Sequence, residues 1–126
     1  MSSNASPSIE SLERNKSNAI SILLGLQNPD ASILLPYLHP TFSAEHGGAA
    51  PSVGGAEGFV SLWQKAITLV PNFRVEVVNA VAEGNLVWVL SKATGLPGGR
   101  EKESVDMMTF DDEGKCLRNK DIQREW

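Results

Sequence analysis

Two residues of this chain are suited to acid–base chemistry, a carboxylate in an apolar strand and a histidine beside glycines. Asp106 lies in the run from Ser104 to Phe110, which otherwise has the pattern of a buried strand. Burying a carboxylate there costs free energy unless the group is paired, protonated or used. His46 precedes Gly47 and Gly48, so backbone or substrate could approach it closely, and imidazole exchanges protons near neutral pH. Both residues are candidate catalytic groups.

Strand alternation assigns neighbours to these groups. Met108 and Phe110 share a face with Asp106, so all three should line the same side if Asp106 faces a cavity. The last predicted strand has one largely polar face, formed by Leu117, Asn119, Asp121 and Gln123. Cys116 lies on the opposite face by the same rule and has no assignable histidine partner, so a covalent nucleophile is unsupported.

The composition excludes several function classes. A chain of 126 residues with 41% hydrophobic content suits one domain. The net charge of −4 and the absence of a basic run argue against nucleic acid and anionic membranes as partners. With two histidines and one cysteine, no metal site is expected, and neither phosphate-loop motif occurs. We expect no cofactor.

The start of the chain and its cysteine content bear on location. Met1 to Ser8 is rich in Ser, Asn and Pro and has no apolar stretch, so it predicts a flexible tail rather than a signal peptide. Apolar runs such as Ile33–Leu35 are too short to span a bilayer. A single cysteine fits a reducing compartment. We therefore expect a cytoplasmic protein with a tail over 1–8 and one domain over 9–126.

The elements that must position these residues change character halfway along the chain. The first half predicts a helix, a short helix, an extended segment and a helix, over Ser8–Gln27, Ala31–Leu38, Thr41–His46 and Gly55–Leu69. The second half predicts strands over Phe73–Val77, Leu86–Thr94, Glu101–Phe110 and Lys115–Gln123. Helices followed by an antiparallel meander indicate an α+β domain with the helices on one face of a curved sheet.

Two hairpin motifs and the element order resemble the nuclear transport factor 2-like superfamily, which includes SnoaL-like polyketide cyclases and ketosteroid isomerases. Val81–Val89 (VAEGNLVWV) is similar to its EGdxVav hairpin, and Phe110–Lys115 (FDDEGK) is similar to its F-x-x-x-G-K turn. The resemblance implies a cone-shaped curved antiparallel sheet wrapped around an N-terminal helical layer. It also implies an internal hydrophobic pocket and a homodimer formed through the sheet.

The same resemblance suggests roles for the candidate residues. Asp106 resembles the protonated oxyanion-hole aspartate of the isomerase group, a carboxylic acid kept neutral by an apolar site. His46 falls where that group has its general-base aspartate. Asp121 would face Asp106 across the pocket, and one of two such carboxylates would hold a proton. No tyrosine occurs at Ser21–Leu24, where that group has one, so steroid chemistry is not carried over.

Each assignment has a simpler alternative. His46 could instead be a histidine at the edge of the loop that contacts water, and Glu45 replaces it as the inward residue if the register is shifted by one. Asp121 could instead be solvated opposite Lys120 or Arg124. The remaining residues expected to bind substrate are Phe59, Trp63, Trp88, Met108, Phe110, Asn119 and Gln123, alongside Glu45. The aromatic and methionine residues among them are more often plain core.

The loop and the last residue also have two interpretations each. The segment from Gly47 to Gly55 is the strongest candidate for a lid, and the alternative is a connector with no gating role. Trp126 could dock on the domain or on a partner subunit, or be disordered.

The function these features favour is that of a cofactor-independent enzyme. It would isomerise, cyclise or dehydrate a small hydrophobic metabolite of polyketide or terpenoid type. His46 would move a proton, Asp106 would donate to a developing oxyanion, and Asp121 would be the second carboxylate. The alternative is a non-catalytic small-molecule-binding or dimerisation domain of the same fold, because fold alone does not decide function.

Overall fold

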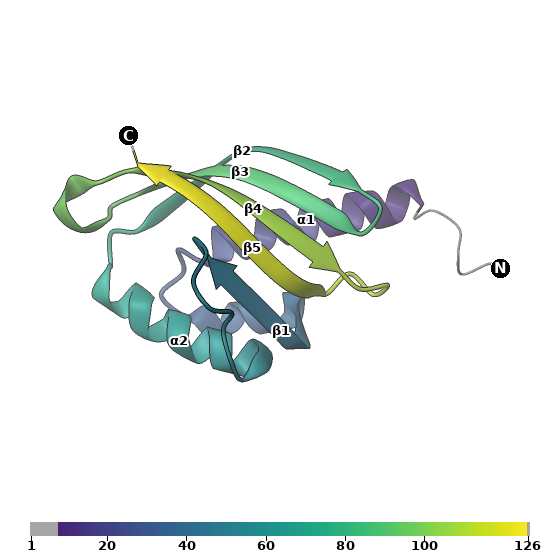
Figure 1. Cartoon of the computed structure of the whole chain (residues 1–126), viewed down its shortest axis with the longest axis horizontal. Helices are drawn as coiled ribbons and strands as arrows, with labels where there is room; N and C mark the ends of the chain where they lie inside the picture. Colours follow the sequence, from purple (N-terminus) through teal and green to yellow (C-terminus); the bar gives the residue numbers. More distant parts are fainter. Residues whose placement is uncertain (1–7, 126) are drawn as a thin grey trace.

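The computed structural model describes residues 8–125; the expectations for the tail before Ser8 and for Trp126 lie outside the described residues. The elements follow the order α1 (Ile9–Gly25), η1 (Ala31–Tyr37), β1 (Leu38–His46), α2 (Gly55–Leu69), β2 (Arg74–Glu83), β3 (Leu86–Thr94), η2 (Pro97–Gly99), β4 (Lys102–Phe110) and β5 (Cys116–Glu125). Helices come first and the long strands follow, as the sequence predicts (Figure 1).

Short polar residues begin both N-terminal helical segments. Ser8 Oγ accepts a hydrogen bond from Ser11 N at 3.0 Å at the start of α1. Asp30 Oδ1 accepts from Ser32 N at 3.0 Å at the start of η1. The second segment is a 3₁₀ helix that contains Pro36, and the chain becomes extended at Leu38, three residues before the predicted start of the strand.

The sheet has the strand order β1-β5-β4-β3-β2. Strands β2 to β5 form the predicted antiparallel meander. Strand β1 joins the edge of this meander by pairing parallel with β5, which makes the sheet mixed. The parallel pair brings the end of the N-terminal half beside the end of the chain, and this proximity matters for the site.

A bulge in β5 changes which side chains face inward. Phe110 pairs with Cys116, whereas Thr109 pairs with Arg118, so Leu117 is an extra residue on β5. Cys116 therefore lies on the inner face with Phe110, and its prediction on the opposite face was wrong. Its side chain is fully buried, and burial raises the pKa of the Cys116 thiol to about 12.

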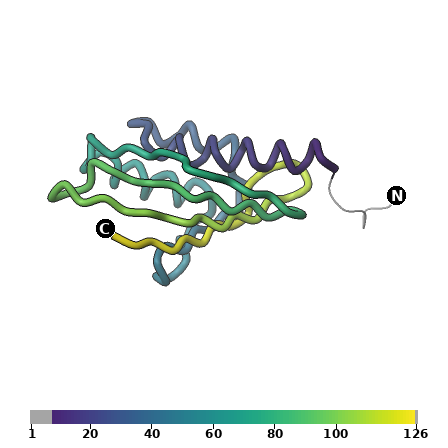
Figure 2. The backbone as a smooth tube through the Cα atoms, turned by 90° about the horizontal axis from the view of Figure 1, so that it is seen from above, coloured from purple at the N-terminus to yellow at the C-terminus, as the bar shows by residue number. Residues whose placement is uncertain are grey.

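Both helices cover one side of the sheet. Helix α1 packs against β2 and β3, and α2 packs against β1 and η1 (Figures 1 and 2). Their apolar residues form one core with the inner face of the sheet, and this core includes Ile22, Val60, Val89 and Met108. No helix within residues 8–125 is long and apolar enough to cross a membrane.

Candidate active site

The inner face of the sheet has an apolar end and a polar end. The apolar end contains Val87, Met108, Phe110 and Cys116, each at most 1% exposed. The polar end, called here the polar cluster, takes residues from β1, β3, β4 and β5: His46, Ser91, Ser104, Asp106, Asn119, Asp121 and Gln123. Strand pairing aligns them in rows, with Ser91 beside Ser104 and Gln123, and Asp106 beside Asp121 and His46.

The parallel pairing of β1 with β5 places His46 opposite Asp121. His46 Nδ1 lies 2.7 Å from Asp121 Oδ2, and Gly47 N donates to Asp121 Oδ1 at 2.8 Å. The Asp121 side chain is 11% exposed, whereas the His46 side chain is 64% exposed. The carboxylate therefore orients the imidazole through Nδ1 and leaves Nε2 available to a ligand. Asp121 faces inward, away from Lys120 and Arg124.

Asp106 lies beside Asp121 in the pairing of β4 with β5 and is 4% exposed. Ser104 Oγ lies 3.0 Å from its Oδ1, and Asn119 Nδ2 donates to its Oδ2 at 2.8 Å. Burial raises the pKa of Asp106, and the charge of Asp121 raises it further, against the opposing effect of the bonds from Asn119 and Ser104. The shift is in the direction that favours the neutral acid, and the neutral state of Asp106 stays a prediction.

Ser104 is a site residue that the sequence reasoning did not single out. Its hydroxyl group contacts the one Asp106 oxygen that Asn119 does not occupy, and it is 6% exposed. A proton on Asp106 Oδ1 would point at Ser104 Oγ, and the serine could then offer its own proton to a ligand. The available signal was its position two residues before Asp106, which puts both on one face.

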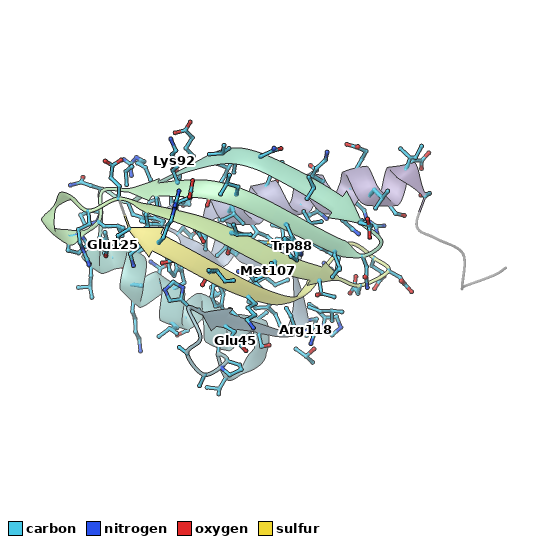
Figure 3. The ribbon with its side chains drawn as sticks, turned by 45° about the horizontal axis from the view of Figure 1, so that its top comes forward. Glu45, Trp88, Lys92, Met107, Arg118 and Glu125 are labelled. Carbon is cyan, nitrogen blue, oxygen red and sulfur yellow. The ribbon has the colours of Figure 1, made fainter. Side chains whose placement is uncertain are left out.

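Glu45 does not belong to this cluster. It pairs with Lys120 on the outer face of the sheet, where its Oε2 lies 3.5 Å from Lys120 Nζ (Figure 3). The expectation that Glu45 binds substrate was therefore wrong. Successive residues of a strand point to opposite faces, so the same register that turns Glu45 outward turns His46 inward.

Trp88 also points away from the predicted pocket. It is 49% exposed on the outer face, where it pairs with Met107 and Val81 (Figure 3). The inward positions of β3 are taken by Val87 and Val89, both fully buried. The expectation that Trp88 binds substrate was wrong because a uniformly apolar strand does not reveal which of its faces is the inner one.

The aromatic residues of α2 lie over the inner side of the domain. The rings of Phe59 and Trp63 stack with their centroids 6.5 Å apart, and Phe42 meets Phe59 edge-on at 5.2 Å. Trp63 Nε1 donates to Leu26 O at 2.9 Å, so its indole is anchored to the end of α1. Phe59 and Trp63 are half-buried and pack against the core. Met108 and Phe110 are core residues, as the simpler alternative states.

The loop after β1 starts at the polar cluster. Gly47 and Gly48 have φ values of 55° and 84°, a region that side chains disfavour, and Gly47 N binds Asp121. Farther along, Ser52 N donates to Ala44 O at 2.8 Å, and Ala44 N donates to Ser52 Oγ at 2.9 Å. The loop is thus attached to the free edge of β1. This position suits a lid, which stays a prediction.

A surface hollow of about 400 Å³ lies elsewhere, between the ends of α1 and α2 and the start of β2. Its lining includes Gln27, Ile67 and Arg74 and no member of the polar cluster. The internal pocket beside Asp106 stays a prediction.

Comparison with known proteins agrees with this fold. The SnoaL-like domain family matches residues 23–119, and the chain belongs to that family. Two fungal proteins, both named "Probable cyclase otaY", are similar in sequence. The one from Aspergillus carbonarius is 34% identical over 110 residues, which cover 86% of this chain and 88% of the relative. The one from Aspergillus niger is 37% identical over 89 residues, which cover 71% and 73%.

Solved structures share the architecture. A protein from Jannaschia sp. CCS1 assigned as a SnoaL-like polyketide cyclase has a TM-score of 0.78 at 18% identity, covering 94% of this chain and 91% of its own. A protein from Kribbella flavida assigned as a ketosteroid isomerase has a TM-score of 0.76 at 17% identity, covering 92% and 82%. These similarities confirm the predicted cone-like fold. The names of the two fungal relatives support a cyclase-type enzyme.

Proposed function

We propose that the protein rearranges a small hydrophobic carbonyl compound by acid–base catalysis. The observation that carries this proposal is the 2.7 Å contact between His46 Nδ1 and buried Asp121, next to buried Asp106 on the same face. A carboxylate that holds one nitrogen of an imidazole orients the other nitrogen as a proton acceptor. The names of the relatives support the same class of reaction.

In this mechanism His46 Nε2 removes a proton from the carbon next to the carbonyl group. The electron pair of the broken C–H bond moves into the carbonyl, and negative charge develops on its oxygen. Neutral Asp106 donates its proton to Ser104 Oγ, and the Ser104 hydroxyl group in turn donates a hydrogen bond to that oxygen. The proton on His46 then goes to a different carbon in isomerisation or to the leaving hydroxyl group in dehydration. In cyclisation the carbanion attacks a second carbonyl group of the same molecule, the electron pair of that C=O bond moves to its oxygen, and this alkoxide takes the proton.

The substrate class follows from the surroundings of the cluster. Asn119 and Gln123 would position polar groups, and Phe59 and Trp63 would contact an apolar body of polyketide or terpenoid type. Proton transfers of this kind can be carried out by side chains alone, so the proposal includes cofactor independence. It also includes the cytoplasmic location expected from the single cysteine.

Hydrogen exchange tests the assigned base directly. In D₂O the wild-type protein should speed the incorporation of deuterium next to the carbonyl of small hydrophobic ketones, as followed by NMR. His46→Ala should lower this rate by about a hundredfold or more, because general-base catalysis contributes about 10²–10⁴-fold. His39→Ala is the matched control, since His39 Nδ1 contacts Thr41 N outside the cluster. Equal rates in the two variants would refute the assignment.

The alternative function is that of a binding domain without catalysis. The complete burial of Met108 and Phe110 favours it, because these side chains fill the apolar end of the inner face. Ketones that bind to the wild type in a titration without any gain in exchange would support the binding domain. Binding accompanied by exchange that depends on His46 would support the enzyme.

The outer face supports a proposal about assembly. Three apolar side chains on it, those of Val81, Trp88 and Ile122, are 62%, 49% and 61% exposed. Val81 pairs with Trp88 across strands β2 and β3, and half-buried Met107 continues this strip on β4. A contiguous exposed apolar strip of this kind is typical of an interface. We propose that a second copy of the chain covers it.

A further inference from the structure

Asn119 has a buried oxygen atom without a hydrogen-bond partner. Among the side chains of residues 8–125, Asn119 Oδ1 is the one buried nitrogen or oxygen atom that has no hydrogen-bond partner. The amide nitrogen of the same side chain, Nδ2, donates to Asp106 Oδ2 at 2.8 Å. An unpaired buried acceptor costs free energy, and native proteins normally pair such atoms with protein, water or a ligand. Asn119 Oδ1 is therefore a candidate contact for a donor that arrives with the substrate.

The hydrogen bonds of Asp106 keep this acceptor in place. Ser104 Oγ contacts Asp106 Oδ1, which leaves Asp106 Oδ2 for the Asn119 amide nitrogen. When Asp106 is neutral with its proton on Oδ1, the proton can point at Ser104 Oγ, and Oδ2 still accepts from Asn119. The observed orientation of the Asn119 amide, with its oxygen unpaired, is therefore compatible with the ionised acid and with the acid protonated on Oδ1.

The neighbours of Asn119 indicate what kind of donor fits. Ala44 on β1 and Met108 on β4 are its pairing partners, so small or apolar side chains flank it on both sides. Of the titratable groups on the same face, Asp121 and His46 are paired with each other, and both oxygens of Asp106 are occupied by Ser104 and Asn119. An ammonium group would lose its hydration here without a free countercharge, whereas a neutral hydroxyl group would not carry that cost.

The spacing along β5 relates this contact to the base. Asn119 lies opposite Ala44 and Asp121 lies opposite His46, two residues farther along both strands. Two residues of a strand span roughly 7 Å. A ligand with its hydroxyl group at Asn119 and its reacting carbon near His46 therefore needs about the length of one substituted ring.

We propose that Asn119 Oδ1 accepts a hydrogen bond from a hydroxyl group of the substrate and so selects hydroxylated carbonyl compounds. The hydroxyl group and the reacting carbon lie at opposite ends of a short, largely apolar molecule. Asn119 is thus a specificity-determining residue. The placement of the reacting end rests on the proposed function, whereas the contact at Asn119 does not.

The test compares two probes of similar shape, 4-hydroxyacetophenone and 4-methylacetophenone. Calorimetric titration should show the wild type binding the hydroxyl probe about fivefold to tenfold more tightly, the effect of one hydrogen bond to a buried acceptor. Asn119→Leu should abolish this preference. Asn79→Leu is the matched control on β2, where Asn79 is exposed, and should keep it. Equal affinity of the two probes for the wild type, or binding of neither, overturns the proposal.

A second measurement needs no variant. With carbon-13 in the side-chain carbonyl of asparagine, the hydroxyl probe should shift the Asn119 resonance of the wild type and the methyl probe should not. Equal shifts with the two probes overturn the proposal. His46→Ala separates it from the proposed function, because that variant should lose deuterium exchange and keep the hydroxyl preference. If the wild type prefers the hydroxyl probe but does not speed deuterium exchange, the role of His46 as base is refuted and that of Asn119 stands. If the wild type speeds exchange but shows no preference for the hydroxyl probe, the role of Asn119 is refuted and that of His46 stands.

Discussion

The two faces of one sheet handle charge in opposite ways. On the outer face, charged pairs such as Glu45 with Lys120 and Arg124 with Glu103 join an exposed basic side chain to a half-buried glutamate. Water screens such pairs, and each contributes little stability. On the inner face, Asp106 and Asp121 are short and buried, and each of their oxygens has a hydrogen-bonding partner. Charged residues on the outer face keep the protein hydrated, whereas those on the inner face can take part in chemistry.

The apolar residues of the two faces differ in the same way. Val87, Val89 and Met108 are buried on the inner face under the helices. Trp88 and Ile122, on the neighbouring positions, are open to solvent. A strand in which apolar and polar residues alternate normally buries one face and exposes the other to water. An exposed outer face that is also apolar is typical of a surface covered by a partner molecule. The inner face accounts for the fold, and the outer face is the proposed site of assembly.

The sharpest test of the inner face replaces Asp106. Asp106→Leu removes the neutral acid and leaves Asn119 Nδ2 without its acceptor, so deuterium exchange into ketones should fall by about a hundredfold. Asp106→Asn keeps the shape and a donor and should lose much less. Circular dichroism would establish that both variants are folded. Full exchange activity in both would exclude a catalytic role for Asp106.

Shortening an apolar side chain should strongly lower the free energy of unfolding where that side chain is buried on the inner face, and hardly at all where it is exposed. Met108 is 1% exposed, so Met108→Ala should lower the free energy of unfolding by about 2–5 kcal/mol through lost burial and a cavity. Leu62→Ala, at a position 62% exposed on α2, should change it by about 0.5 kcal/mol or less. Urea denaturation measures both. A similar loss in the two variants would contradict the core assignment.

Disruption of the outer face should change assembly and leave the fold intact. Trp88→Glu puts a charge in the apolar strip and should convert the dimer to monomer, as measured by analytical ultracentrifugation. Leu62→Glu, at a comparably exposed apolar position on the helical side, should leave the dimer in place. A wild type that is monomeric at high concentration would rule out the proposed interface.

The smallest expected effect is a pH dependence of stability from Asp106. Burial, and then the charge of Asp121, raise its folded pKa above the unperturbed 3.8, so the native state binds the proton more tightly than the unfolded state. The resulting stabilisation is complete below pH 3.8 and is lost as the pH rises through the raised pKa. The wild type should therefore lose stability relative to Asp106→Asn as the pH rises from 3.8 through the raised pKa of Asp106, as followed by urea denaturation. A constant difference between the two proteins would contradict the raised pKa.

The sequence alone was sufficient to predict the order of the elements and which side chains share a face of β4. Helical periodicity, the caps at Ser8 and Asp30 and the turn motifs are local signals, and the order of elements follows from them. Alternation placed Asp106 with Met108 and Phe110, because side chains of a strand change face at every residue. These features depend on neighbours in the chain, so one sequence suffices.

Only the tertiary structure decided the register of the strands and the hydrogen-bonding partners of the buried polar side chains. The choice between Glu45 and His46 needed the parallel pairing of β1 with β5, and the position of Cys116 needed the bulge at Leu117. Trp88 was misplaced because a strand that is apolar on both faces carries no sign of which one the helices cover. The contacts of Asp106 and Asp121 join residues far apart in the chain, and such contacts exist only once the strands are side by side.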